Sequence, residues 1–134
     1  MFAIIIDNHK IFRSGLSSFL KKFDSSVEIE EMSFSGFFDR NSLRIPDLIL
    51  TTLTNYSCSE INTITKIKEQ NPSSKIFAVA KFIDDRTIDS KVIDLFDRVF
   101  FKQEDFRNNF PAMDFNNNRN ESTLKSHIVI NPTF

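Results

Sequence analysis

The residues best suited to chemistry follow short apolar runs, where a strand would end. These strand-end residues are Asp7, Asn8, Thr51, Thr52, Ala80, Lys81 and Lys102. They offer no charged nucleophile beside a general base. Asp7 beside Lys102 predicts a structural ion pair, and Asn8 predicts a helix cap. Thr51 and Thr52 have two interpretations, because such residues form strands and turns but their hydroxyls can also hold an anion near a helix start.

Apolar runs alternate with amphipathic segments along the first 110 residues, and these elements must position the strand-end residues. Strands are predicted over Phe2–Ile6, Val27–Met32, Asp47–Thr51, Lys75–Ala80 and Arg98–Phe101. Helices are predicted over 12–23, 34–43, 57–71 after a capping box of Ser57 and Glu60, 84–95 after Asp84 or Asp85, and 104–110. The alternation predicts an α/β fold, a five-stranded doubly wound parallel sheet of flavodoxin-like order 2-1-3-4-5 with a short or degenerate last helix. Its site would lie at the carboxyl ends of the strands.

Composition excludes several classes of function. The chain has 134 residues, a formal net charge of -1 and only 2 Gly, so it has neither a glycine-rich phosphate loop nor the excess positive charge of a nucleic-acid domain. The single Cys58 cannot form an intramolecular disulfide, and it is either simply buried or reactive at a helix start. His9 and His127 are too isolated for a metal site. No signal peptide or membrane span is evident, which predicts a cytoplasmic protein without a membrane partner.

One stretch near the start of the chain resembles a known family. Residues 4–16 read Ile-Ile-Ile-Asp-Asn-His-Lys-Ile-Phe-Arg-Ser-Gly-Leu, and two further stretches read Pro-Asp-Leu-Ile-Leu over 46–50 and Phe-Phe-Lys over 100–102. Together they resemble the receiver domains of bacterial response regulators, specifically those of LuxR-type (NarL/FixJ) transcription regulators. The resemblance covers roughly residues 1–110, and its first motif is fairly specific to this branch.

The resemblance implies roles for the strand-end residues. In this family two acidic residues and a phosphoacceptor Asp bind magnesium, while a hydroxyl residue and a Lys hold the phosphate. This chain keeps Asp7 and Lys102. At four positions it differs from the family. Asn8 replaces the second acid, Thr52 the phosphoacceptor, Ala80 the hydroxyl residue and Val99 the aromatic switch residue. We therefore predict a pseudo-receiver that has lost phosphorylation chemistry, binds no metal or other cofactor, and is not an enzyme.

The 16 Phe residues predict two populations. Most recur at strand or helix spacing and predict a core between sheet and helices. Phe37, Phe38, Phe106 and Phe110 lie in weak helices, where a small fold cannot wholly cover them. We therefore predict that these four rings form a protein interface. The alternative is that they fill the core like the other rings.

The function predicted from the sequence is that of a regulatory module. Residues 1–112 form a receiver-like domain, and the asparagine-rich residues 113–134 form a linker or tail that would lead to a helix-turn-helix domain absent from this chain. The module would dimerise with itself or a related regulator, or dock on another protein, and would reach DNA only through that missing domain. The alternative is a flavodoxin-like small-ligand or phosphate-binding protein that uses the hydroxyl-rich turn at 51–59.

Overall fold

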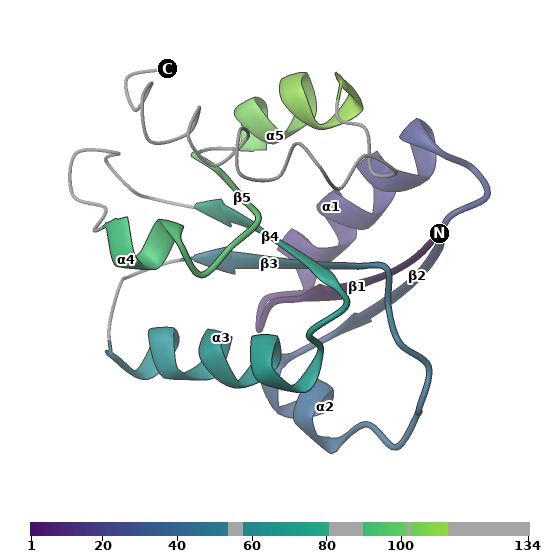
Figure 1. The fold of residues 1–134 in the computed structure, drawn as a ribbon. Coiled ribbons are helices and arrows are strands. Elements are labelled where there is room, and N and C mark those ends of the chain that lie inside the picture. Colours follow the sequence, from purple (N-terminus) through teal and green to yellow (C-terminus); the bar gives the residue numbers. More distant parts are fainter. Residues whose placement is uncertain (54–57, 81–89, 102, 113–134) are drawn as a thin grey trace.

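Five parallel strands form one sheet at the centre of the molecule (Figure 1). The computed structural model describes residues 1–53, 58–80, 90–101 and 103–112. The strands are β1 (Phe2–Ile6), β2 (Glu28–Met32), β3 (Leu48–Leu53), β4 (Lys75–Ala80) and β5 (Arg98–Phe100). Their order is β2-β1-β3-β4-β5, which confirms the flavodoxin-like order predicted from the sequence. β1 and β3 are buried along their whole length because helices cover both faces of the sheet.

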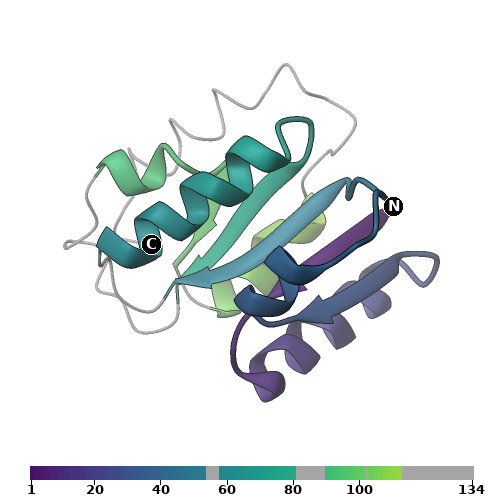
Figure 2. The ribbon, with the colours of Figure 1, turned by 90° about the horizontal axis from the view of Figure 1, so that it is seen from below.

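Helices pack on both faces (Figures 1 and 2). One face carries α1 (Lys10–Phe23), α5 (Gln103–Asn109) and the 3-10 turn η2 (Phe110–Ala112), and the other carries α2 (Phe34–Asp39), α3 (Cys58–Gln70) and α4 (Ser90–Ile93). Leu16 and Leu20, four residues apart on α1, are buried against the sheet. Burial of each such side chain contributes about 1.5–3 kcal/mol. No helix in the described part of the chain is long and apolar enough to cross a membrane.

Phenylalanine rings join α1 to the end of the fold. Phe106 lies 5.1 Å from Phe19 and 5.0 Å from Phe100, and Phe110 lies 5.2 Å from Phe23, measured between ring centroids. Phe106 and Phe110 are fully buried by these contacts. The predicted interface at these two rings is therefore wrong, because η2 prolongs α5 and folds Phe110 back onto α1.

The other two predicted interface rings lie on α2. Phe37 is buried in the core on the α2 and α3 side, so the interface prediction is wrong there too. Phe38, the next residue, is 38% exposed and packs edge-on against Phe37. Of the four rings, only Phe38 keeps a surface that a partner can contact.

Several element ends differ from the predicted ones. β1 and β4 have their predicted bounds, whereas α2 ends at Asp39 rather than at residue 43, because Arg40 takes an extended backbone with ψ 138. β3 continues to Leu53 because Ala80 on β4 pairs with it. Ser57, Asp84 and Asp85 lie outside the described residues, as does the tail from residue 113.

Replacing Gly15 with alanine is expected to raise the free energy of unfolding by about 0.5–1 kcal/mol. Gly15 lies inside α1, and an added Cβ would meet nothing within 4 Å. The gain comes from the lower backbone entropy of alanine in the unfolded chain. Urea denaturation followed by circular dichroism measures the change, and a loss of stability would contradict it.

Candidate functional site

The candidate site lies where β1 and β3 end side by side. Ile6 pairs with Thr51 in the parallel register, so the residues that follow them, Asp7 and Thr52, are neighbours at the carboxyl edge. The Thr52 hydroxyl donates a hydrogen bond to Oδ1 of Asp7 over 2.9 Å. Asp7 is 3% exposed and Thr52 2% exposed, so this bond joins two buried groups.

Asp7 is also fixed through its backbone. Its N–H donates to the Met32 carbonyl at the end of β2 over 3.1 Å, and its carbonyl accepts from Nη1 of Arg13 over 2.6 Å. Arg13 lies on α1, and its Nε is 3.9 Å from a carboxylate oxygen of Glu31 on β2. Arg13 therefore ties α1 to the ends of β1 and β2. Arg13 belongs to the motif at residues 4–16 that was recognised in the sequence, but residue spacing does not indicate that it joins these elements.

Lys102 was expected beside Asp7, and the structure places His9 near it as well. Nδ1 of His9 lies 3.8 Å from Oδ1 of Asp7, although the His9 side chain is 73% exposed. Lys102 lies outside the described residues, so the predicted ion pair with Asp7 stays a prediction. The structure shows a Thr52 contact with Asp7 that sequence reasoning missed. The parallel register of neighbouring strands was the signal for it.

Asn8 caps a helix, although not the one that follows it. Its Oδ1 accepts the N–H of Phe34 over 3.1 Å, at the first residue of α2. The preceding Ser33 accepts the N–H of Gly36 over 3.1 Å, so two side chains satisfy the open end of this short helix. α1 has His9 at its N-cap, without a side-chain hydrogen bond. An amide thus stands where the resemblance expects a metal-binding acid.

Replacing Asn8 with alanine is expected to lower the free energy of unfolding by about 1 kcal/mol. The variant leaves the Phe34 N–H without its side-chain acceptor and loosens the joint between the end of β1 and α2. Chemical denaturation gives the loss of stability. Hydrogen exchange shows where it falls, and equal protection of α2 in both proteins would contradict the capping role.

Three further positions considered in the sequence, Thr51, Ala80 and Val99, are buried in the structure. Ala80 ends β4 with a fully buried methyl group, and Val99 on β5 is 1% exposed within the core. Thr51 is fully buried, and its hydroxyl makes no hydrogen bond to any described residue. A buried hydroxyl without a partner costs about 1–3 kcal/mol.

The donor set does not fit the magnesium ion that the resemblance implies. Mg²⁺ needs several hard oxygen ligands, usually including one or two carboxylates. Asp7 supplies one carboxylate, which already accepts from Thr52, and the amide oxygen of Asn8 already accepts from α2. Among the described residues no group of three or more His, Cys, Asp or Glu side chains can hold a metal ion. The arrangement joins structural elements and leaves no ionised nucleophile at position 52.

Comparison with known proteins identifies relatives over part of the chain. No protein-family model matches it. The response regulator protein VraR of Staphylococcus aureus, in strains Mu3 and NCTC 8325, is 30% identical over 88 residues, which are 63% of this chain and 41% of VraR. The chain therefore spans less than half the length of the curated relatives that it matches. These relatives confirm the predicted resemblance.

Solved structures show the same fold. RcsB of Salmonella typhimurium superposes with a TM-score of 0.66 and 21% identity, covering 84% of this chain and 56% of RcsB. The isolated REC (receiver) domain of RcsB from Salmonella enterica serovar Typhimurium, in its apo form, gives a TM-score of 0.65 with 20% identity, covering 84% of this chain and 83% of that domain. The described residues thus have the receiver fold.

Proposed function

We propose that this receiver domain, a homologue of response regulators, is a regulatory module that works without aspartyl phosphorylation. The observation that carries the proposal is the buried hydrogen bond from Thr52 to Asp7 at the carboxyl edge. In the receiver domains that this chain resembles, the residue equivalent to Thr52 is the phosphoacceptor and the residue equivalent to Asp7 is a metal ligand. Here the two side chains bond to each other.

Chemistry at position 52 supports the loss of phosphoryl transfer. A threonine hydroxyl is a weak nucleophile unless a base or a metal activates it. The Mg²⁺ that neutralises charge in phosphoryl transfer lacks its ligands, because Asn8 has no carboxylate and its amide oxygen caps α2. Ala80 carries a methyl group where the family has the hydroxyl that holds the phosphate. Three parts of the reaction are thus replaced, at Asn8, Thr52 and Ala80, while Asp7 and Lys102 remain.

The proposed output is contact with another protein. Receiver relatives assemble and bind DNA as whole proteins: RcsB has been solved as dimers on two parallel DNAs and in a DNA complex. We propose that this domain likewise serves a transcription regulator by dimerisation or partner docking. Residues 1–112 would be the domain and residues 113–134 the connection toward a DNA-binding domain. The flavodoxin-like alternative needs the turn at 51–59, of which residues 54–57 lie outside the described residues.

Acetyl phosphate with Mg²⁺ tests the proposal. Intact-mass measurement is expected to show no change in this protein, because no carboxylate stands at position 52. A mass gain of about 80 Da, a phosphoryl group, mapped to a residue of the carboxyl edge would overturn the proposal.

A matched variant shows that the assay can detect acceptance. Thr52→Asp combined with Asn8→Asp and Ala80→Thr restores the family's residue type at three of the positions where this chain differs. This variant is expected to gain the phosphoryl mass that the natural chain does not. Both proteins are measured under the same conditions, so the absence of a mass gain in the natural chain cannot be attributed to a failure of the assay.

A further inference from the structure

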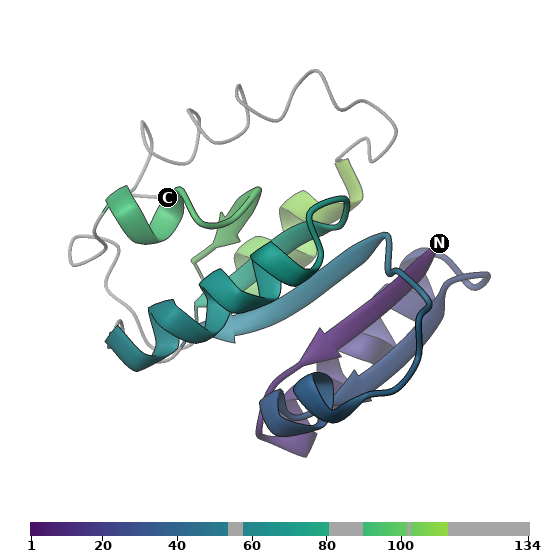
Figure 3. The same ribbon diagram turned by 60° about the horizontal axis from the view of Figure 1, so that its bottom comes forward.

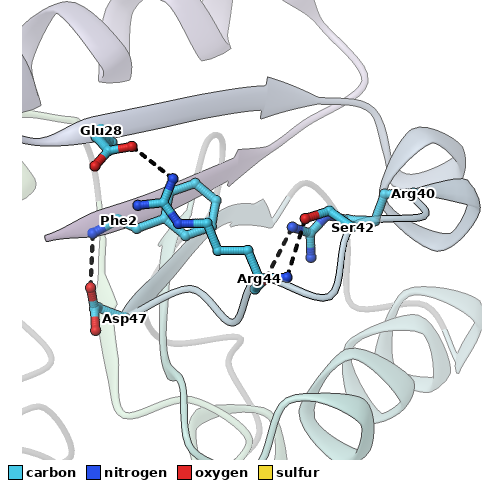
Figure 4. A network of polar contacts seen from close by, with 6 residues as sticks. All are labelled: Phe2, Glu28, Arg40, Ser42, Arg44 and Asp47. Carbon is cyan, nitrogen blue, oxygen red and sulfur yellow. Dashed lines mark hydrogen bonds and ion pairs between the residues drawn. The ribbon is translucent and has the colours of Figure 1, made fainter.

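Residues 40–47, here called the strap, connect α2 to β3 past the amino ends of the central strands (Figure 3). Asp47 holds one end of the strap to β1. Its carboxylate accepts the Phe2 N–H over 2.8 Å, and its own N–H donates to the Phe2 carbonyl over 2.8 Å (Figure 4). The strap is therefore anchored to the first residue of the sheet.

Arginines hold the rest of the strap. The Arg44 guanidinium lies 4.0 Å above the Phe2 ring and donates to Glu28 on β2 over 2.7 Å (Figure 4). The Arg40 guanidinium donates to the Arg44 carbonyl over 3.2 Å, and the Arg44 N–H donates to the Ser42 hydroxyl over 3.2 Å. The cationic groups of the strap are thus engaged within the fold, and its backbone has a defined path.

Two aliphatic side chains of the strap point to solvent instead. Leu43 is 95% exposed and Ile45 64% exposed, on either side of Arg44. Apolar side chains on an anchored backbone form a binding surface whose ordering cost is already met in the free protein. The contacts of Arg40, Arg44 and Asp47 therefore hold the backbone in a path that leaves Leu43 and Ile45 exposed to solvent.

The chain leaves the described fold at the same edge of the sheet. Phe110 of η2 contacts Phe23 at the end of α1, and the turn after α1 leads to Glu28, whose N–H donates to the Met1 carbonyl over 2.9 Å. Ala112, where η2 ends, is thus close to the amino edge, which also carries the strap.

The sequence after Ala112 supplies a matching segment. Residues 113–123 are mostly polar, and residues 124–134, here called the tail segment, contain Leu124, Ile128, Val129, Ile130 and Phe134. Eleven residues reach about 36 Å when extended, which exceeds the radius of gyration of about 13 Å for a domain of this size. A tethered segment has an effective concentration in the millimolar range, so a small apolar contact suffices to hold it.

We propose that the strap is the docking site for the chain's own tail segment, with Leu43 and Ile45 covered by its aliphatic side chains. Charge agrees with this occupant. Glu28 is paired with Arg44, but the exposed Glu30 also faces the strap side of β2, since it pairs with Ile4, while the tail segment carries Lys125 and no acidic side chain. The inference does not depend on whether the domain accepts a phosphoryl group.

A spin label on the tail segment tests this contact in the full 134-residue chain. Asn131→Cys carries a nitroxide in a Cys58→Ser background, and the amide signals of Leu43, Arg44 and Ile45 are compared with those after reduction of the label. We expect these signals to lose most of their intensity while the label is paramagnetic. Unchanged intensities would overturn the proposal.

Two controls separate the occupants. Ile128→Ser with Ile130→Ser in the labelled chain is expected to restore the signals, and persistence of the loss would show that the aliphatic side chains do not make the contact. Mixing isotope-labelled chain with spin-labelled chain that has no isotope detects contact between copies. Loss of intensity in the mixture would show that the strap contacts the tail segment of a second copy, which would overturn docking within one chain.

Hydrogen exchange provides an independent measurement without a label. Leu43→Ser with Ile45→Ser changes two exposed side chains and leaves the anchoring residues intact. In this variant we expect amides 124–134 to exchange several-fold faster than in the natural chain. Equal exchange of the tail segment in both proteins would contradict docking on the strap.

Discussion

Replacing Phe110 with alanine is expected to lower the free energy of unfolding by about 3–5 kcal/mol. The ring is fully buried, with its centroid 4.9 Å from Phe106 and 6.2 Å from Phe77. Its loss leaves a cavity lined by other rings, which are held by the sheet and by α1 and cannot close the space. Because single domains have a net stability of about 5–15 kcal/mol, this one change removes a large part of it.

Phe38→Ala is the matched control, since it deletes the same ring from a position that is 38% exposed. We expect a loss of less than about 1 kcal/mol there, because water reaches the side chain and no closed cavity forms. Urea denaturation followed by circular dichroism gives both values. Similar losses for the two variants would show that Phe110 does not complete the core.

Replacing Thr52 with aspartate is expected to lower the free energy of unfolding by about 3 kcal/mol at neutral pH. The new carboxylate takes the place of a hydroxyl that lies 2.9 Å from the Asp7 carboxylate, with both residues buried. Repulsion raises the pKa of the introduced carboxyl in the folded state above its unfolded value of about 3.9. The loss is therefore small below about pH 4 and grows as the pH rises through the folded pKa.

Thr52→Val separates charge from the lost hydrogen bond. It removes the donor to Asp7 without adding an acid and is expected to cost about 1.5 kcal/mol. Mg²⁺ should recover part of the stability of Thr52→Asp, since two carboxylates then face the ion, and should leave the natural chain unchanged. If Thr52→Asp behaves like Thr52→Val at every pH, the two side chains are not close in solution.

The sheet was predictable because its signals are local. Uninterrupted apolar runs mark β1 and β4, and their bounds agree with the structure. Alternation of strands and helices then leaves few topologies, since parallel crossovers are right-handed. β2 is an edge strand, and its glutamates are exposed.

The end of α2 and the burial of the two rings on α5 and η2 were not predictable from local pattern. α2 was predicted to continue to residue 43, but it ends at Asp39, and contacts of Arg44 with Glu28 and of Asp47 with Phe2 favour an extended path. Phe106 and Phe110 lie in a segment with weak helical signals, and contacts with rings of α1 and of the sheet explain their burial. Both results depend on residues that are distant in sequence, which periodicity does not detect.

The candidate site was predictable in place but not in detail. Strand ends located Asp7 and Thr52 at one edge, as the topology requires. The Thr52 hydrogen bond and the cap from Asn8 to α2 depend on register and on rotamers, which sequence pattern does not fix. The sequence predicted an ion pair for Asp7 and a helix cap for Asn8, whereas in the structure Asp7 accepts a hydrogen bond from Thr52 and Asn8 caps α2.

The ring contacts between α1 and η2 also set a condition on biosynthesis. Phe19 and Phe23 emerge from the ribosome early, yet their partners Phe106 and Phe110 follow more than eighty residues later in the chain. Because an open apolar surface in a partly made chain favours aggregation, α1 needs protection, by a chaperone or by rapid translation, until η2 has been made. Messenger variants that slow translation before codon 110 should therefore lower the yield of folded protein more than variants that slow it afterwards.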